Sequence, residues 1–322
     1  MILVFVEHEA GELKGQSRDA LAFARGIGAS LGARLHVVAI GDGAAAAAPA
    51  LSGVDVLYAL RIEGTYAPAA WAEALAQLLE EASPQMVVAA ATDRGSELLA
   101  HLGANRELPM ISNCIEVTPG DPTLITRERW GGTVLEEVRT SAPQLLLTVS
   151  ASADVAEDDS SLGAGAPALE ELVIVPAPED LRACLVRVEP LGGSGISLPE
   201  ARIVVGGGRG VGSSQGFGIL DELADRLGGA VGVSRAVTSA GWRPHAEQIG
   251  QTGVRIAPDL YIACGISGAS QHMVGCAGAK RILVINADPD ASIMARADEA
   301  VVGDLLTVVP AIIEEIKRRL SA

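Results

Sequence analysis

The sequence predicts an α/β protein of two domains, each built on a largely parallel sheet flanked by helices. The chain has 322 residues and is 49% hydrophobic, which is enough for two buried cores. In both halves, short apolar segments alternate with amphipathic segments of helical period, a pattern typical of parallel sheets covered on both faces. The glycine-rich break at 192–201 has the composition of a linker, so we expect domains over 1–191 and 202–322.

The N-terminal domain is expected to alternate strands and helices and then to add strands alone. Pro68 suits the first position of a helix, where its missing N–H costs nothing. From about residue 113 the helical pattern disappears, which favours an antiparallel addition to the same sheet. Residues 151–167 are polar and aperiodic and indicate a surface loop, after which 171–191 returns to strand character. The expected elements are strands over 2–7, 34–40, 54–60, 85–92, 113–117, 123–127, 132–138 and 144–150, and helices over 17–31 and 68–83.

The C-terminal domain repeats the alternation from Arg202 onward. Its expected strands begin at 202 and cover 230–237, 260–265, 281–288 and 299–304, with helices over 217–227 and 305–320. Ligands of parallel sheets bind beyond the carboxyl ends of the strands. That rule selects four segments as one rim: 206–212, 234–235, 265–272 and 286–288.

Charge and composition exclude several classes of protein. The net charge is −16, and residues 1–200 hold all of the excess, with 28 acidic and 12 basic side chains. Nucleic acid is therefore not expected as a partner. No apolar run reaches membrane-spanning length and the start of the chain does not resemble a signal peptide. Four widely spaced cysteines without a C-x-x-C favour a reducing cytoplasm over disulfides or a metal.

Glycines crowd the end of the strand that begins at Arg202. The segment GGGRGVG, residues 206–212, misses the dinucleotide spacing G-x-G-x-x-G by one residue, and the absence of a following Lys-Ser/Thr excludes a P-loop. Such glycines either make an ordinary turn or let backbone amides approach a phosphate. Arg209 within the segment favours an anion.

The other rim segments offer a cation, a hydroxyl and an imidazole. Ser234 and Arg235 end a short strand, and Ile249–Gly253 forms a tight Gln-Thr-Gly turn. Ser267 is a plausible helix N-cap after the strand ending at Gly265, with His272 one or two turns into the helix. Each of these residues also has a purely structural interpretation: a surface ion pair, a plain turn or a buried histidine. Together they suit a redox nucleotide, for which the protein supplies position and electrostatics.

In this order, the motifs GGGRG, GVSRA, GQTG, GISGASQH, INADPDA and VGDLLTVVP closely resemble the alpha subunit of the electron transfer flavoproteins. The block APDLYIACGISGASQHMVG carries most of the likeness. The N-terminal segments VFVEHEAGELKGQSRDALAFARGIG and ATDRGSELLAHLGANRELP extend it over the whole chain. The stretch RERWGGTVLEEVRTSAPQLL departs from the Tyr-x-Gly-Asn pattern that family members often carry there.

The resemblance implies a Rossmann-like, deoxyhypusine-synthase-like C-terminal domain that binds FAD. It implies that Arg235 lies beside the isoalloxazine and stabilises negative charge on the reduced flavin, that Thr252 bonds flavin N5, and that His272 bonds flavin O2. Asn286, Asp304 and Leu305 would hold the adenosine end. The remaining FAD contacts that the resemblance implies are Arg209, Ser234, Ile249, Gly250, Gln251, Ser267, Gly268, Ala269, Ser270 and Gln271.

The resemblance also implies an electron carrier without substrate turnover of its own. Electrons would come from flavin dehydrogenases, such as the acyl-CoA dehydrogenases of fatty acid β-oxidation, and go to a quinone oxidoreductase. The N-terminal domain would contact a beta subunit, which would hold AMP or, in electron-bifurcating relatives that use NADH, a second FAD. Two alternatives stay open: a non-redox adenine-nucleotide-binding module and an NAD-dependent enzyme. The enzyme would need a lysine or another catalytic group at the rim, and Lys14, Lys280 and Lys317, the lysines of the sequence, do not lie in a rim segment.

Overall fold

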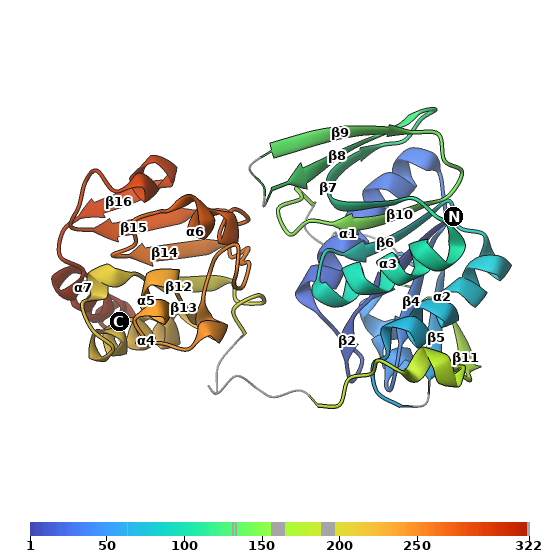
Figure 1. Cartoon of the computed structure of the whole chain (residues 1–322), viewed down its shortest axis with the longest axis horizontal. Helices are drawn as coiled ribbons and strands as arrows, with labels where there is room; N and C mark the ends of the chain where they lie inside the picture. Colours follow the sequence, from blue (N-terminus) through green and yellow to red (C-terminus); the bar gives the residue numbers. More distant parts are fainter. Residues whose placement is uncertain (63, 131, 133, 156–164, 188–196, 321–322) are drawn as a thin grey trace. The chain divides into compact units, whose positions relative to one another are not determined.

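The structure is a computed structural model that describes residues 1–62, 64–130, 132, 134–155, 165–187 and 197–320. Figure 1 shows the chain as two units, one formed by Met1–Trp130 with Val134–Glu189 and the other mainly by Pro190–Ala322. Half of the expected linker, residues 192–196, and residues 156–164 of the expected loop lie outside the described residues. Each unit is an α/β layer structure, so the predicted fold class is confirmed.

The N-terminal unit is built on a sheet that contains nine strands among the described residues, in the order β11-β5-β4-β1-β6-β10-β7-β8-β9. All neighbours from β11 to β7 pair in parallel, whereas β7–β8 and β8–β9 are antiparallel. The strands are β1 (Ile2–Val6), β4 (Leu35–Ile40), β5 (Val56–Ile62), β6 (Met86–Ala90), β7 (Met110–Thr118), β8 (Thr123–Arg129), β9 (Val134–Thr140), β10 (Leu145–Val149) and β11 (Ala168–Ile174). A short hairpin, β2 (His8–Glu9) and β3 (Glu12–Leu13), follows β1.

The expected antiparallel addition is confirmed for β8 and β9 but is wrong for β10, which pairs in parallel with both β6 and β7. Its five residues are all buried, and a continuous apolar run buried on both faces is typical of a central parallel strand. The strand character expected over 171–191 ends at Ile174. A short 3₁₀ turn, Pro178–Leu181, follows it, where Pro178 cannot donate to a sheet.

Three helices cover the N-terminal sheet. Alternate side chains of β1 point to opposite faces, so α1 (Gly15–Leu31) packs over Ile2 and Val4, while α2 (Pro68–Ala82) and α3 (Asp93–Arg106) pack over Leu3 and Phe5. The sequence-based element assignment missed α3. Its start is nevertheless marked by Thr92, whose hydroxyl accepts a 2.9 Å bond from the Gly95 N–H and caps the helix.

The C-terminal unit has a fully parallel sheet in the order β13-β12-β14-β15-β16. Helices α4, α5 and α7 cover one face, and α6 with the segment around Ile249 and Ile293 covers the other. The elements are β12 (Ile203–Gly207), β13 (Ala230–Val233), β14 (Leu260–Cys264), β15 (Ile282–Asn286), β16 (Glu299–Val302), α4 (Gly218–Leu227), α5 (Arg235–Ser239), α6 (Ser270–Gly275) and α7 (Leu305–Leu320). The expected 230–237 strand therefore stops at Val233, and a helical turn begins at Arg235.

No helix in the described part of the chain is both long and apolar enough to cross a membrane. The described residues also contain no group of three or more His, Cys, Asp or Glu side chains that could hold a metal ion. All four cysteines are free thiols.

Candidate cofactor-binding site

Two cavities lie at the carboxyl ends of strands in the C-terminal sheet. The smaller has a volume of about 200 Å³ and the larger about 440 Å³. Both are lined by Ser234, Ala236 and Ser267, so they adjoin one another and together make up a depression along the rim that the strand-end rule selects. Residues from all four predicted rim segments line it.

The glycine cluster at the end of β12 is explained by the close approach of two backbone segments, the ones that follow β12 and β14. The Gly208 N–H donates to Cys264 O at 2.9 Å, and the Gly210 N–H donates to Gly265 O at 3.0 Å. A Cβ on Gly208 would lie 2.2 Å from Gly265 O, and Gly265 itself has a φ of +62°. The glycines thus bring the ends of β12 and β14 together, and they leave a floor of backbone beside the larger cavity.

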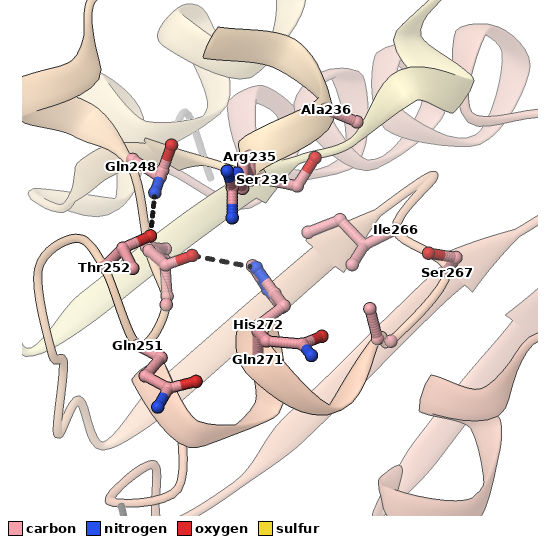
Figure 2. Close-up of a pocket in the computed structure, with 14 residues that line it drawn as sticks. Ser234, Arg235, Ala236, Gln248, Gln251, Thr252, Ile266, Ser267, Gln271 and His272 are labelled. Carbon is pink, nitrogen blue, oxygen red and sulfur yellow. Dashed lines mark hydrogen bonds between the residues drawn. The ribbon is translucent and has the colours of Figure 1, made fainter. Parts of the chain in front are cut away.

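Arg235 supplies positive charge at the smaller cavity. The Ser234 N–H donates to Gly207 O at 3.0 Å, which fixes the end of β13 beside the end of β12, and α5 begins with Arg235. The Arg235 side chain is exposed and, among the described residues, makes no ion pair. Figure 2 shows it extending into the same space as the His272 ring. The structural interpretation of Arg235 as a partner in a surface ion pair is therefore not supported by the residues that the structure describes.

The Gln-Thr-Gly turn forms another wall of the smaller cavity. Its ends are joined by backbone bonds, from the Val254 N–H to Gln248 O at 2.7 Å and from the Gly250 N–H to Val254 O at 3.2 Å. Gly250 has a φ of +151°, a backbone conformation that side chains disfavour. The Thr252 hydroxyl accepts a 3.0 Å hydrogen bond from Gln248 Nε2, seen as a dashed line in Figure 2.

Small residues form the entrance to α6, as the sequence predicts, but the helix begins later than expected. Ser267 is not the N-cap: α6 starts at Ser270, after Ala269, which makes no side-chain cap. The reason is Gly268, whose φ of +82° turns the chain away from helix and whose Cβ would lie 2.3 Å from Ile293 N. Ser267 and Gly268 therefore line the cavity from the loop before the helix.

His272 is 6% exposed, and both of its ring nitrogens have protein partners. Nδ1 lies 3.2 Å from Ile249 O and Nε2 lies 2.8 Å from the Tyr261 hydroxyl. A carbonyl oxygen can accept only, so Nδ1 carries the proton and Nε2 accepts from Tyr261. Burial lowers the pKa of His272 to about 4, against the opposing effect of the bond to Ile249 O. The ring is thus a neutral donor through one nitrogen.

The structure separates the predicted adenosine contacts. Asn286 is 8% exposed and lines the larger cavity, where its Nδ2 donates to Ile266 O at 2.8 Å. Asp304 accepts from the Leu306 N–H at 2.9 Å and so caps α7, while the Leu305 side chain is buried in the core beneath that helix. Asp304, Leu305 and the exposed Ser270 line neither cavity.

All the other predicted contact residues line one or both cavities. Three further lining residues belong neither to the predicted contacts nor to the predicted rim segments. Eleven predicted residues line the smaller cavity: Ser234, Arg235, Ile249, Gly250, Gln251, Thr252, Ser267, Gly268, Ala269, Gln271 and His272. Arg209 and Asn286 line the larger one, with Ser234 and Ser267 shared. The residues that sequence reasoning missed are Ala236, Gln248 and Ala291. A usable signal existed for Gln248, a polar residue directly before the Ile249–Gly253 turn.

Comparison with known proteins shows which family the chain resembles. Residues 197–277 match the model of the electron transfer flavoprotein FAD-binding domain, and residues 2–176 match the model of the electron transfer flavoprotein domain. The chain is 35% identical to the electron transfer flavoprotein subunit alpha of Bacillus subtilis over 98% of its own length and 97% of the relative. It is 36% identical to the subunit of the same name from Mycobacterium leprae over 98% of both chains. For the Pseudomonas aeruginosa subunit the identity is 36% over 96% of this chain and 97% of the relative.

Proposed function

Because this chain belongs to the family of electron transfer flavoprotein alpha subunits, we propose that it carries electrons from flavin dehydrogenases to a quinone oxidoreductase. Its C-terminal unit is the FAD-binding domain of that family. Acyl-CoA dehydrogenases are the donors we propose, which places the protein in fatty acid β-oxidation. FAD, when bound, supplies the redox chemistry; the residues of this chain bind it, orient it and set its electrostatic surroundings.

The residues of the depression fit FAD. Glycines at its edge allow backbone segments to pack closely around it: a Cβ on Gly250 would lie 3.0 Å from Gln271 O, and one on Gly268 would lie 2.3 Å from Ile293 N. The two joined cavities differ in lining, since the smaller holds Arg235, Thr252 and His272 while the larger holds Arg209 and Asn286. A long ligand with a ring system at one end and a nucleotide at the other suits this division.

We assign the flavin ring to the smaller cavity. The guanidinium of Arg235 is a positive charge at this cavity, and a fixed positive charge stabilises a ligand that gains negative charge on reduction. Thr252 would donate to flavin N5, and the turn residues Ile249, Gly250 and Gln251 would border the same edge of the ring. This open cavity, with an arginine that makes no ion pair to any residue the structure describes, is the single observation that carries the proposal.

His272 can offer one proton to the ring carbonyl O2. In the structure that proton sits on Nδ1 and is directed to Ile249 O, so the flavin oxygen and Ile249 O are alternative acceptors for it. Tyr261 holds the other nitrogen and keeps it an acceptor. Burial keeps the pKa of His272 at about 4, so the residue contributes a neutral hydrogen bond and no positive charge near neutral pH.

The rest of the cofactor would follow the rim toward α7. We propose that Ser267, Gly268, Ala269, Ser270 and Gln271 contact the FAD, with the helix amides near the pyrophosphate. Arg209 and Ser234 would contact the FAD as well, and Asn286 the adenosine. Asp304 and Leu305 sit at the N-terminus of α7 with their side chains already engaged in capping and packing. Contact through their backbone is therefore what we propose for these two residues.

A beta subunit completes the working protein. We propose that the N-terminal unit forms much of that contact, and exposed apolar side chains on the two edge strands of its sheet support this. Leu135 on β9 is 61% exposed, and Val173 on β11 is 74% exposed. The partner would hold AMP, or a second FAD if the pair bifurcates electrons. Four unpaired thiols fit our proposal that the pair works in a reducing cytoplasm.

Co-expression with the beta subunit tests the function. The purified pair should be a yellow heterodimer with one FAD attributable to this chain, and an acyl-CoA dehydrogenase with its substrate should bleach the flavin absorbance. A colourless pair would overturn FAD binding at this rim, and a yellow pair that the dehydrogenase cannot reduce would overturn the donor. Rapid reduction by NADH, with electrons divided between two acceptors, would instead assign electron bifurcation.

A further inference from the structure

Gln248 is a buried polar residue that joins two elements around the smaller cavity. Its side chain is 2% exposed and lines the cavity between α5 and the Gln-Thr-Gly turn (Figure 2). Oε1 accepts a 2.6 Å bond from the Thr238 hydroxyl on α5, and Nε2 donates a 3.0 Å bond to Thr252 Oγ1. Both ends of the amide are therefore engaged.

The two distances determine which way the amide points. An O–H···O bond is shortest near 2.6 Å, whereas an N–H···O bond is normally about 2.9–3.0 Å. The 2.6 Å contact to Thr238 thus fits Oε1, because an amide N–H bond of that length would be too short, and the 3.0 Å contact to Thr252 is a normal length for a bond from Nε2. The Thr238 hydroxyl is also 3.0 Å from Arg235 O, and the shorter contact assigns its proton to Gln248.

The orientation of the amide sets the polarity of Thr252. A hydroxyl has one proton and two acceptor lone pairs, and Gln248 occupies a lone pair of Thr252 Oγ1. The hydroxyl proton is then left to donate into the cavity. The backbone of Gln248 holds the turn in place as well, because its carbonyl accepts from the Val254 N–H and lies 2.1 Å from where a Cβ on Gly253 would be.

We propose that Gln248 is a positioning residue that makes Thr252 a hydrogen-bond donor toward the bound cofactor. It acts through Thr252 and is itself held by Thr238, which anchors the amide to the helix that begins with Arg235. The inference rests on the proposed function, because it takes the acceptor to be N5 of a flavin in the smaller cavity. It assigns a role to a residue that the sequence motifs did not single out.

Binding of FAD and of 5-deaza-FAD to the complete heterodimer tests the proposal. The analogue carries a carbon in place of N5 and has the same charge, so the ratio of the two dissociation constants isolates the bond at that atom. The wild-type pair should bind FAD roughly tenfold more tightly than the analogue, the effect of about one hydrogen bond. In Gln248→Glu the side chain has the same shape, but its carboxylate can only accept hydrogen bonds. The Thr252 hydroxyl would then donate to this carboxylate and not to flavin N5, so the ratio should fall to about one.

Three further variants complete the design. Thr252→Val lacks the hydroxyl and should also give a ratio near one, whereas Gln215→Glu, which adds the same charge at an exposed residue that lines neither cavity, should keep the wild-type ratio. Thr238→Val removes the hydrogen bond that holds Gln248 Oε1, so the Gln248 amide is oriented less strictly and the ratio of dissociation constants should fall to about threefold. It reaches the same amide from α5, and therefore tests the proposal even if Gln248→Glu does not fold.

The outcomes separate the inference from the function beneath it. A wild-type ratio near ten that persists in Gln248→Glu or in Thr238→Val, while Thr252→Val abolishes it, would overturn the role of Gln248 and leave the flavin placement intact. A ratio near one in the wild type itself would overturn the placement of flavin N5 at Thr252, and the inference with it.

Discussion

The two units share a parallel-sheet architecture, but they differ in what happens at the carboxyl ends of their strands. In the N-terminal unit the polar groups there are bonded to one another: the Thr92 hydroxyl donates to Glu7, and the Arg94 guanidinium lies 4.7 Å from the centre of the Tyr66 ring and 5.5 Å from that of Trp71. In the C-terminal unit Arg235 lies beside a cavity and, among the described residues, has no ion pair.

The difference shows that a strand-end rim is a potential site, and that its side chains decide whether it is used. A cation stacked on aromatic rings is already stabilised by them and is therefore less available to interact with a ligand. A cation at a cavity, beside donors held by their own partners, is available to whatever binds. The charge distribution follows the same division, since the excess negative charge lies in residues 1–200, outside the rim.

The largest effect we expect follows from the close backbone approach at the C-terminal rim. In Gly208→Ala the new Cβ would lie 2.2 Å from the backbone oxygen of Gly265, a clash that no side-chain movement relieves. The C-terminal unit should lose about 3 kcal/mol of unfolding free energy, and the heterodimer should purify with little FAD. Calorimetry and the flavin absorbance of the purified pair measure the two effects.

Two alanine variants sharpen this contrast. Gly95→Ala would place a Cβ 2.3 Å from Ala90 O in the N-terminal unit, and it should destabilise that unit without a direct effect on the flavin site. Gly218→Ala, where nothing lies within 4 Å of the new atom, should leave both properties unchanged. Normal FAD content in Gly208→Ala would mean that the close approach of Gly208 to Gly265 does not shape the rim.

The sequence is sufficient to predict the fold class and most of the residues at the cavities, because strand ends and glycines are marked locally. It is not sufficient where contacts between residues far apart in the sequence determine how a strand pairs or where a helix begins. The parallel placement of β10 depends on which strands it lies between, and the late start of α6 depends on contact between Gly268 and Ile293. For Gln248 the sequence shows a polar residue directly before the Ile249–Gly253 turn, but its role arises from partners on α5 and on that turn, which spacing does not reveal.

Acid should weaken the C-terminal unit through His272. Its folded pKa is about 4, below the ordinary value of 6.5, so between these values the unfolded chain binds a proton that the folded chain does not. The unfolding free energy should therefore fall as the pH decreases from 6.5 to 4, by about 2 kcal/mol for this group. Urea unfolding at pH 7 and pH 4.5 measures the loss.

His272→Gln removes the titrating group and should flatten that part of the pH dependence, although it lowers stability at pH 7. In the N-terminal unit burial also lowers the pKa of His36, whose Nδ1 lies 3.3 Å from the Tyr58 hydroxyl. A His36→Gln variant should then flatten the pH dependence of that unit instead. An unaltered pH dependence of the C-terminal unit in His272→Gln would show that the ring is already protonated when folded.

The smallest effect we expect distinguishes the two arginines directly. Arg235→Ala removes a cation from the side of the proposed flavin cavity, which should disfavour negative charge on the reduced flavin and lower the two-electron potential by about 30 mV, or about 1.4 kcal/mol. Stability should change little, because the side chain is exposed.

Arg94→Ala should have the reverse effect. It removes the contacts with the rings of Tyr66 and Trp71, which should lower the unfolding free energy by about 1 kcal/mol, and it should leave the flavin potential unchanged. Redox titration and thermal unfolding of both variants measure this exchange. Equal potentials in the two would mean that an open arginine at a strand-end rim influences its ligand no more than a stacked one, and the contrast between the two rims would lose its functional meaning.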